Sequence, residues 1–219
     1  KSEAGLISTS RALELKHNHP LILIQRVEFL SLLGRHGEVK QTLETLADDQ
    51  SGDPDIHTNI AMLLSAEEMH RAAIRHYLVA VQLRPKDAQL YYNLAAAYRF
   101  TGDSQKCEAS LNKCLSINYL DAEAQSMRSS LRTQSESDNH IDELIRAHTD
   151  RAISESDKSG MCYALSKEFD DLDNIEKSFS YLKKGSEIRR ASMSYDVKTD
   201  ENIMEAIKNK FDRPTCRKT

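Results

Sequence analysis

The sequence predicts an all-α fold built from repeated pairs of antiparallel helices. The 219 residues include only 7 glycines and 4 prolines, so few residues that break helices or form turns are present. Charged residues make up 29% of the chain and aromatic residues 6%, a composition that favours amphipathic helices over a sheet. The third observation is a spacing, because Pro20 and Pro54 lie one 34-residue step apart.

The clearest unit spans residues 88–121. Its first helix carries apolar side chains at i, i+3, i+4 and i+7, which mark one buried face. These are Tyr91, Leu94, Ala95 and Tyr98. Gly102 ends that helix, since glycine readily adopts the left-handed conformation found just after helix ends. A second apolar face follows, formed by Cys107, Leu111, Cys114 and Ile117.

The same pattern recurs upstream in steps of 34 residues. In 54–87 the two apolar faces consist of His57, Ile60, Ala61 and Leu64, and then of Ala73, Tyr77, Ala80 and Leu83. In 20–53 they consist of Leu23, Val27 and Leu30, and after Gly34 of Val39, Leu43 and Leu46. Residues 6–19 predict the second helix of an earlier unit. Region 1–121 is therefore interpreted as a partial repeat followed by repeats at 20–53, 54–87 and 88–121.

This pattern resembles the tetratricopeptide-repeat (TPR) family. The shared features are the 34-residue unit, the alternation of small and large packing residues, a glycine between the helices and a proline near the end of the unit. The resemblance implies a right-handed α–α superhelix, that is, a solenoid of antiparallel helix pairs. Because one helix pair cannot bury its apolar face alone, neighbouring pairs must stack and share a continuous core.

The period weakens after residue 121. Arg128 and Ser129 stand where the register expects apolar side chains, although Met127 and Leu131 can still pack. The stretch Thr133–Asn139 is polar and has no apolar period, so it predicts a loop. Region 122–158 is accordingly interpreted as a degenerate repeat and linker.

A last TPR-like unit is predicted at 159–190, three residues off the 34-residue grid. Its two helix faces carry Cys162, Leu165, Ser166 and Phe169, and then Ser178, Leu182 and Gly185. In region 191–219 a helix over Asp200–Phe211 presents Ile203, Ile207 and Phe211 at i, i+4 and i+8. We expect this helix to cap the open end of the stack, followed by a short tail.

The segment Met161–Phe211 also resembles the junction found in bacterial TPR sulfotransferases. There the last repeat ends in a small residue, basic residues and a Tyr-Asp pair. The matching residues here are Gly185, Arg189, Arg190, Tyr195 and Asp196. The resemblance implies a downstream catalytic domain that uses phosphoadenosine phosphosulfate (PAPS). No phosphosulfate loop follows Phe211 in this chain, so we assign no catalytic residue and expect the chain itself not to be an enzyme.

By resemblance to other TPR proteins, positions 2, 5, 6, 9, 12 and 13 of each first helix line a concave groove. Position 6 holds a carboxamide in three successive units, and a carboxamide both donates to and accepts from a peptide backbone. Such a ladder would hold an extended partner chain; alternatively, these side chains are simply solvated. Arg99 would pair with a partner carboxylate, or is likewise solvated. The candidate groove residues are Gln25, Asn59, Asn93, Asp55, Gln89, Tyr92 and Arg99.

Other chemistry has little support in the sequence. The eight histidines lack metal-site spacing, so neither a metal nor a cofactor is predicted, and nucleotide-binding and hydrolase motifs do not occur. A net charge of -4 gives no general attraction to nucleic acid, and no apolar run approaches the roughly 20 residues of a membrane span. The cysteines form no CxxC pair, which favours free thiols and a cytoplasmic location. They are Cys107, Cys114, Cys162 and Cys216.

Three functions follow as hypotheses. The leading one is a protein-interaction scaffold that binds a peptide or a helix of a partner protein in the groove. The alternative is the N-terminal repeat region of a sulfotransferase whose catalytic domain lies downstream. This alternative fits a chain that begins with Lys1 inside a repeat, as a piece of a longer protein would. The third is an architectural solenoid that associates with copies of itself.

Overall fold

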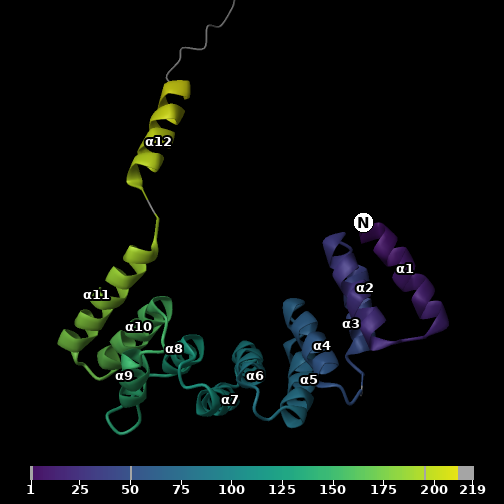
Figure 1. Ribbon diagram of the computed structural model, residues 1–219, viewed down its shortest axis with the longest axis horizontal. Coiled ribbons are helices and arrows are strands. Elements are labelled where there is room, and N and C mark those ends of the chain that lie inside the picture. The colour runs from purple at the N-terminus through teal and green to yellow at the C-terminus, as the bar shows by residue number, and fades with distance from the viewer. Residues whose placement is uncertain (1, 50, 195, 212–219) are drawn as a thin grey trace, which may run out of the picture.

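The computed structural model describes residues 2–49, 51–194 and 196–211, and these residues form helices with a single isolated β-bridge. The helices are α1 (Ser2–Leu15), α2 (Pro20–Leu32), α3 (His36–Leu46), α4 (Pro54–Ala66), α5 (His70–Leu83), α6 (Ala88–Phe100), α7 (Ser104–Ile117), α8 (Ala122–Ser130), α9 (Ile141–Thr149), α10 (Glu155–Asp171), α11 (Ile175–Ser192) and α12 (Val197–Phe211). Figure 1 shows them following one another along an open arch, with α1 and α11 at its opposite ends.

The central part of the arch consists of the pairs α2/α3, α4/α5 and α6/α7, which lie within the intervals 20–53, 54–87 and 88–121. The helices of each pair pack against each other, and α5 also packs against α6 of the next pair. In Figure 1 α6 lies on the inner side of the arch and α7 on the outer side. The free face of α6 therefore lies toward the inner side of the arch.

An aspartate is the N-cap residue of each of the first helices α4, α6 and α8. Asp53, Asp87 and Asp121 accept hydrogen bonds from backbone N–H groups of the first turn, at 2.8, 3.1 and 2.9 Å. These bonds satisfy amide groups that lack a partner inside the helix. Because the three caps lie 34 residues apart, they start the three helices at the same point of the register.

The apolar core is continuous only over the first part of the chain. One cluster of buried side chains runs from Leu6 in α1 to Ala124 in α8. Beyond it the described residues form two small separate clusters, one around Met161 and one around Leu165. The packing of α8, α9 and α10 therefore needs additional interactions.

The region after residue 121 keeps helices but shortens them. Helices α8 and α9 are nine residues each, and the segment between them, which includes Thr133–Asn139, is not helical. Helix α10 packs against α8 and α9 as well as against α11. Arg128 and Ser129 are 4% and 1% exposed, so the two positions where the apolar pattern fails are nevertheless buried.

The expected capping role of the C-terminal helix needs correction. Helix α12 contains the expected segment Asp200–Phe211, but none of its residues is buried, and it projects beyond α11 (Figure 1). Its apolar residues Ile203, Ile207 and Phe211 are 48–80% exposed, so it does not cover the end of the stack. The pattern identified the amphipathic face of the helix but not a surface to receive it. Tyr195 and the tail after Phe211, with Cys216, lie outside the described residues.

Candidate functional site

Two cavities flank α6 at the face formed by the first helices. The first lies between α6 and the preceding pair and has a volume of about 570 Å³. We call it the aromatic pocket; its lining includes His70, Tyr77, Asn93, Ala96, Ala97 and Phe100. The second lies between α6, α8 and α10 and has a volume of about 540 Å³. We call it the α8 pocket; its lining includes Tyr92, Arg99, Glu123, Ser126, Met127 and Asp157.

The aromatic pocket combines small and ring-bearing side chains. Ala96 and Ala97 leave the space open, and the ring of Tyr77 is buried against the core. Phe100 stacks on His70, with ring centroids 4.4 Å apart and planes at 6°. Nevertheless 73% of Phe100 is exposed. An apolar side chain from outside would bury this ring, which water now covers.

The α8 pocket is polar and carries opposite charges on its two sides. Arg99 projects from α6, whereas Glu123 lies in the first turn of α8 and Asp157 in the first turn of α10. Burial and the nearby carboxylate of Glu123 raise the pKa of Tyr92 to about 12. The Tyr92 hydroxyl therefore stays protonated at neutral pH and remains a hydrogen-bond donor.

The structure brings three of the seven candidate groove residues to these cavities. Asn93 lines the aromatic pocket, and Tyr92 and Arg99 line the α8 pocket. Gln89 lies one helical turn before Asn93, and its Nε2 donates to Asn93 Oδ1 at 3.0 Å.

The remaining three candidates lie elsewhere. Gln25 and Asn59 are exposed and line neither cavity. Both oxygens of Asp55 accept from the Arg84 guanidinium at 2.6 Å, and these hydrogen bonds lower the pKa of Asp55. Asp55 is thus occupied by a partner within the chain. The four candidates on α6 therefore lie together, whereas Gln25, Asp55 and Asn59 lie apart from them.

Four groove residues on α8 were missed by the sequence interpretation. Glu123, Ser126, Met127 and Ser130 line the α8 pocket. Each lies 34 residues after an α6 residue at a groove position, namely Gln89, Tyr92, Asn93 and Ala96. Extending the register through the degenerate unit would have found them. The polar residues at 128 and 129 concealed that continuity.

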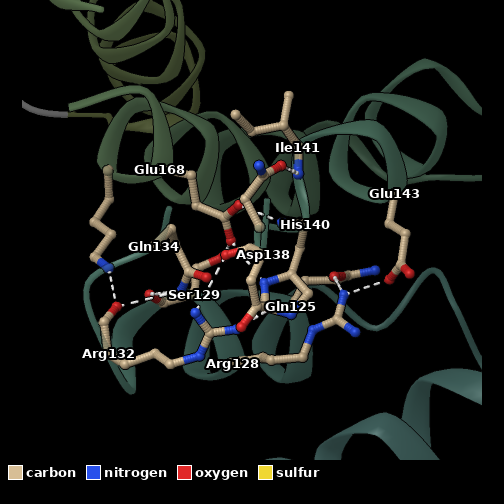
Figure 2. Close-up of polar contacts among 12 residues, drawn as sticks. Gln125, Arg128, Ser129, Arg132, Gln134, Asp138, His140, Ile141, Glu143 and Glu168 are labelled. Carbon is tan, nitrogen blue, oxygen red and sulfur yellow. Dashed lines mark hydrogen bonds and ion pairs between the residues drawn. The ribbon is translucent and has the colours of Figure 1, made fainter. Parts of the chain in front are cut away.

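A buried polar network holds α8, which forms one wall of the α8 pocket. Glu168 of α10 is fully buried, and Figure 2 shows its carboxylate directed toward Ser129 and His140. The Ser129 hydroxyl donates to Oε1 at 2.5 Å, the His140 backbone N–H donates to Oε2 at 2.7 Å, and the His140 ring Nδ1 lies 3.1 Å from Oε1. Burial raises the pKa of Glu168, but the hydrogen bonds from His140 and Ser129 outweigh it, and the pKa lies below its usual value.

Arg128 forms the second half of this network. Its guanidinium donates to Gln125 at 2.9 Å and to Glu143 of α9 at 2.5 Å (Figure 2). It also donates to Asn112 of α7 at 2.9 Å. A guanidinium at this depth is costly unless its charge is paired, and here Glu143 pairs it. Both terminal nitrogens donate, whereas the buried Nε has no hydrogen-bond partner among the described residues. The network therefore ties α8 to α7, α9 and α10.

Within the described residues no group of three or more His, Cys, Asp or Glu side chains is placed to hold a metal ion. No helix in the described ranges is long and apolar enough to cross a membrane.

Comparison with known proteins agrees with this architecture. A family model described as tetratricopeptide repeat matches residues 76–109, which run from α5 into α7. The fold is a tetratricopeptide-repeat solenoid. No curated protein sequence matches the chain significantly. The resemblance of Met161–Phe211 to sulfotransferase junctions thus receives no support from sequence comparison.

Solved structures with the same fold include three that cover most of the chain. The MamA protein aligns with a TM-score of 0.59 and 13% identity over 81% of this chain and 96% of its own. YrrB, titled a TPR protein with an unusual peptide-binding site, gives 0.56 and 15% over 84% and 94%. BtubC from P. vanneervenii gives 0.54 and 16% over 89% and 93%. At these identities the likeness concerns the fold alone.

Proposed function

We propose that this solenoid is a protein-interaction scaffold whose inner groove binds an extended segment of a partner protein. The observation that carries the proposal is the pair of cavities on either side of α6, about 570 and 540 Å³ in volume. Side chains from a single segment crossing α6 would enter both. The exposed ring of Phe100 and the exposed guanidinium of Arg99 supply one apolar and one charged contact.

Asn93 is the residue we expect to contact the partner backbone. It is half-buried on α6, and its Oδ1 already accepts from Gln89. The bond with Gln89 fixes the amide plane and leaves its N–H groups to donate to a carbonyl of the partner. A preoriented donor loses less side-chain entropy on binding than a mobile one.

Selection from a random peptide library displayed on phage tests the proposal. The protein would be panned in three forms: wild type, Ala96→Trp, and Lys113→Trp. Ala96 lines the aromatic pocket, so the indole fills it, whereas Lys113 is exposed on α7, on the outer side of the arch. We expect peptides that bind wild type and Lys113→Trp but not Ala96→Trp. Thermal unfolding of all three forms checks that the substitutions leave the fold intact.

Peptides that bind Ala96→Trp as well as wild type would place binding outside the groove and contradict the proposal. A library that yields no binder to the wild type would contradict it as well. Asn93→Ala then sharpens the result, because it should weaken every groove-dependent peptide whatever its sequence. An effect confined to some peptides would argue against a backbone contact.

The cysteines support a reducing compartment, and with it the cytoplasmic location. Cys107, Cys114 and Cys162 are buried and free. Burial raises the pKa of all three thiols, to about 12 for Cys114, so the reactive thiolate is disfavoured. These cysteines act as small packing residues in the helix interfaces.

A second candidate is the repeat arm of a sulfotransferase, for which the exposed apolar face of α12 is the favouring observation. Ile203, Met204, Ile207 and Phe211 are 48–80% exposed, as expected of a helix that another domain covers. The complete gene tests this candidate. A glycine- and serine-rich strand–loop–helix encoded soon after residue 219 would support it, and a gene without one would exclude it.

A further inference from the structure

The two pockets beside α6 differ in chemistry, and that difference specifies a partner sequence. The aromatic pocket is bounded by the ring of Phe100 and by alanines, and its open volume is large enough for a ring. Met62 on α4 is a further large apolar side chain at a groove position of the register, and 53% of it is exposed. These exposed apolar surfaces would be buried by an aromatic or a large aliphatic side chain.

The α8 pocket has an excess of negative charge. Among the described residues that line it, Glu123 and Asp157 are acidic and Arg99 is the only cation. Both carboxylates are exposed, and Asp157 also accepts from the Ser154 hydroxyl at 2.6 Å. A lysine or arginine of the partner matches this balance better than an acidic residue does.

The width of α6 gives the expected spacing of the two side chains. Packed helices lie about 8–10 Å apart, so pockets on the two sides of α6 are separated by about one helix diameter. A polyproline II segment advances about 3.1 Å per residue with three residues per turn, so residues i and i+3 face the same way about 9 Å apart. A β-strand presents i and i+2 about 7 Å apart and i and i+4 about 13 Å apart, and neither spacing fits as well.

We propose that the groove selects a polyproline II-like segment with an apolar side chain and, three residues away, a lysine or arginine. The apolar side chain occupies the aromatic pocket against Phe100, and the cation meets Glu123 and Asp157 in the α8 pocket. This inference rests on the proposed function and adds a sequence preference to it. The polarity of the bound segment decides which of the two residues comes first, so both orders belong in the test.

Fluorescence polarisation with dye-labelled peptides tests the preference. The probes are Gly-Ser-Phe-Pro-Pro-Lys-Ser-Gly and the same peptide with phenylalanine and lysine exchanged. We expect one order to bind. Alanine in place of phenylalanine should weaken binding about tenfold, from the apolar area left unburied. Glutamate in place of lysine should weaken it about fivefold or more, since it replaces an ion pair by repulsion.

A charge exchange separates a specific contact from general attraction. Glu123→Lys should weaken the lysine peptide and strengthen the glutamate peptide. Glu155→Lys is the control, because Glu155 of α10 is also exposed but pairs with Lys158 and does not line the pocket, and it should shift both peptides little. Ala96→Trp should abolish binding of every probe.

The outcomes distinguish this inference from the proposed function. Groove-dependent peptides that lack the apolar–x–x–basic spacing, or that ignore the charge exchange, would overturn the inference and leave the scaffold function standing. If neither the probes nor the random library yields a peptide sensitive to Ala96→Trp, both proposals fail. Groove-dependent peptides from the library that carry the spacing would support both.

Discussion

The pair α6/α7 and the region α8–α10 share one 34-residue register but fill it with different chemistry. In α6 two adjacent core positions hold Leu94 and Ala95, which are 3% and 0% exposed. In α8 the positions 34 residues later hold Arg128 and Ser129, which are 4% and 1% exposed. The depth of burial is the same, although the side chains have changed from apolar to polar. The repeat continues in space where its sequence pattern has disappeared.

The difference shows what a solenoid needs in order to replace an apolar layer with a polar one. Ser129 is bonded to Glu168 of α10, and Arg128 to Asn112, Gln125 and Glu143. Hydrogen bonds depend on direction, so a shift of α10 along α8 would break them, whereas an apolar contact would adjust. The polar layer therefore fixes the position of α10, and with it the far wall of the α8 pocket.

The largest expected effect comes from removing the centre of the polar layer. Glu168→Ala leaves the Ser129 hydroxyl and the His140 N–H groups buried without their acceptor. We expect a loss of about 3–5 kcal/mol in the free energy of unfolding. Urea denaturation at pH 7 measures it. A loss below about 1 kcal/mol would mean that water enters and replaces the carboxylate.

Leu111→Ala in α7 is the matched control from the apolar layer, since Leu111 is also fully buried. It should cost a similar 2–5 kcal/mol. The pH dependence separates the two variants. The folded-state pKa of Glu168 lies below its unfolded value of 4.5, so its contribution is present above pH 4.5 and is lost as the pH falls through the folded pKa. The Glu168→Ala deficit should therefore narrow below pH 4.5, and the Leu111→Ala deficit should not.

The regular units could be predicted from sequence because their packing contacts repeat at fixed offsets. With a period of 34 residues, Leu94 aligns in sequence with Ile60 and Ala95 with Ala61, so each unit supports the interpretation of the next. The polar layer could not be predicted this way. Ser129 and Glu168 lie 39 residues apart in sequence. Their hydrogen bond does not follow the 34-residue period, and no local sequence pattern predicts it.

The candidate groove was predictable to the same extent and for the same reason. Tyr92 and Arg99 could be assigned to the candidate groove because α6 follows the register. Glu123 was not assigned to it because the apolar pattern fails in α8. The position of α12 lay beyond any periodic argument. Amphipathicity indicates which face of a helix is to be covered but not what covers it.

Alanine substitution of two glycines, Gly185 and Gly160, should give the next largest change in the free energy of unfolding. The two variants test how tightly α10 is packed. A Cβ on Gly185 of α11 would lie 2.9 Å from Cys162 Cβ and 3.2 Å from the Ser159 carbonyl oxygen. Gly185→Ala should therefore destabilise the fold by about 1–3 kcal/mol through overpacking. Chemical denaturation measures the change.

Gly160→Ala on α10 provides the control, because its Cβ would meet only Ala122 Cβ at 4.0 Å. That substitution should stabilise the helix by up to about 1 kcal/mol, through the higher helix propensity of alanine. Opposite signs for the two variants would confirm that α11 packs tightly against α10. A stabilising Gly185→Ala would show that the two helices separate easily.

The apolar layer of α4 and α5 contains one polar exception, a pair of buried histidines. His57 and His76 are 2% and 3% exposed, and their Nδ1 atoms lie 2.8 Å apart. His76 Nε2 lies 3.2 Å from the Ala47 carbonyl oxygen and donates to it. His57 Nε2 likewise lies 2.5 Å from the Ser51 carbonyl oxygen and donates to it, so in the neutral rings both facing Nδ1 atoms are acceptors. The pair thereby holds the segment after α3 against α4 and α5, where α3 and α4 themselves touch at few positions.

The smallest expected effect is the pH dependence of this pair. Burial lowers the pKa of His76 below 6.5, and the positive charge of Arg75 acts in the same direction. The folded state thus binds fewer protons than the unfolded state, so the contribution is present above pH 6.5 and is lost as the pH falls through the folded pKa. Denaturation midpoints from pH 7.5 to 5.5 should therefore fall less in His76→Gln than in the wild type. The exposed His17→Gln should keep the wild-type slope, and an unchanged slope in His76→Gln would show that the pair does not sense pH.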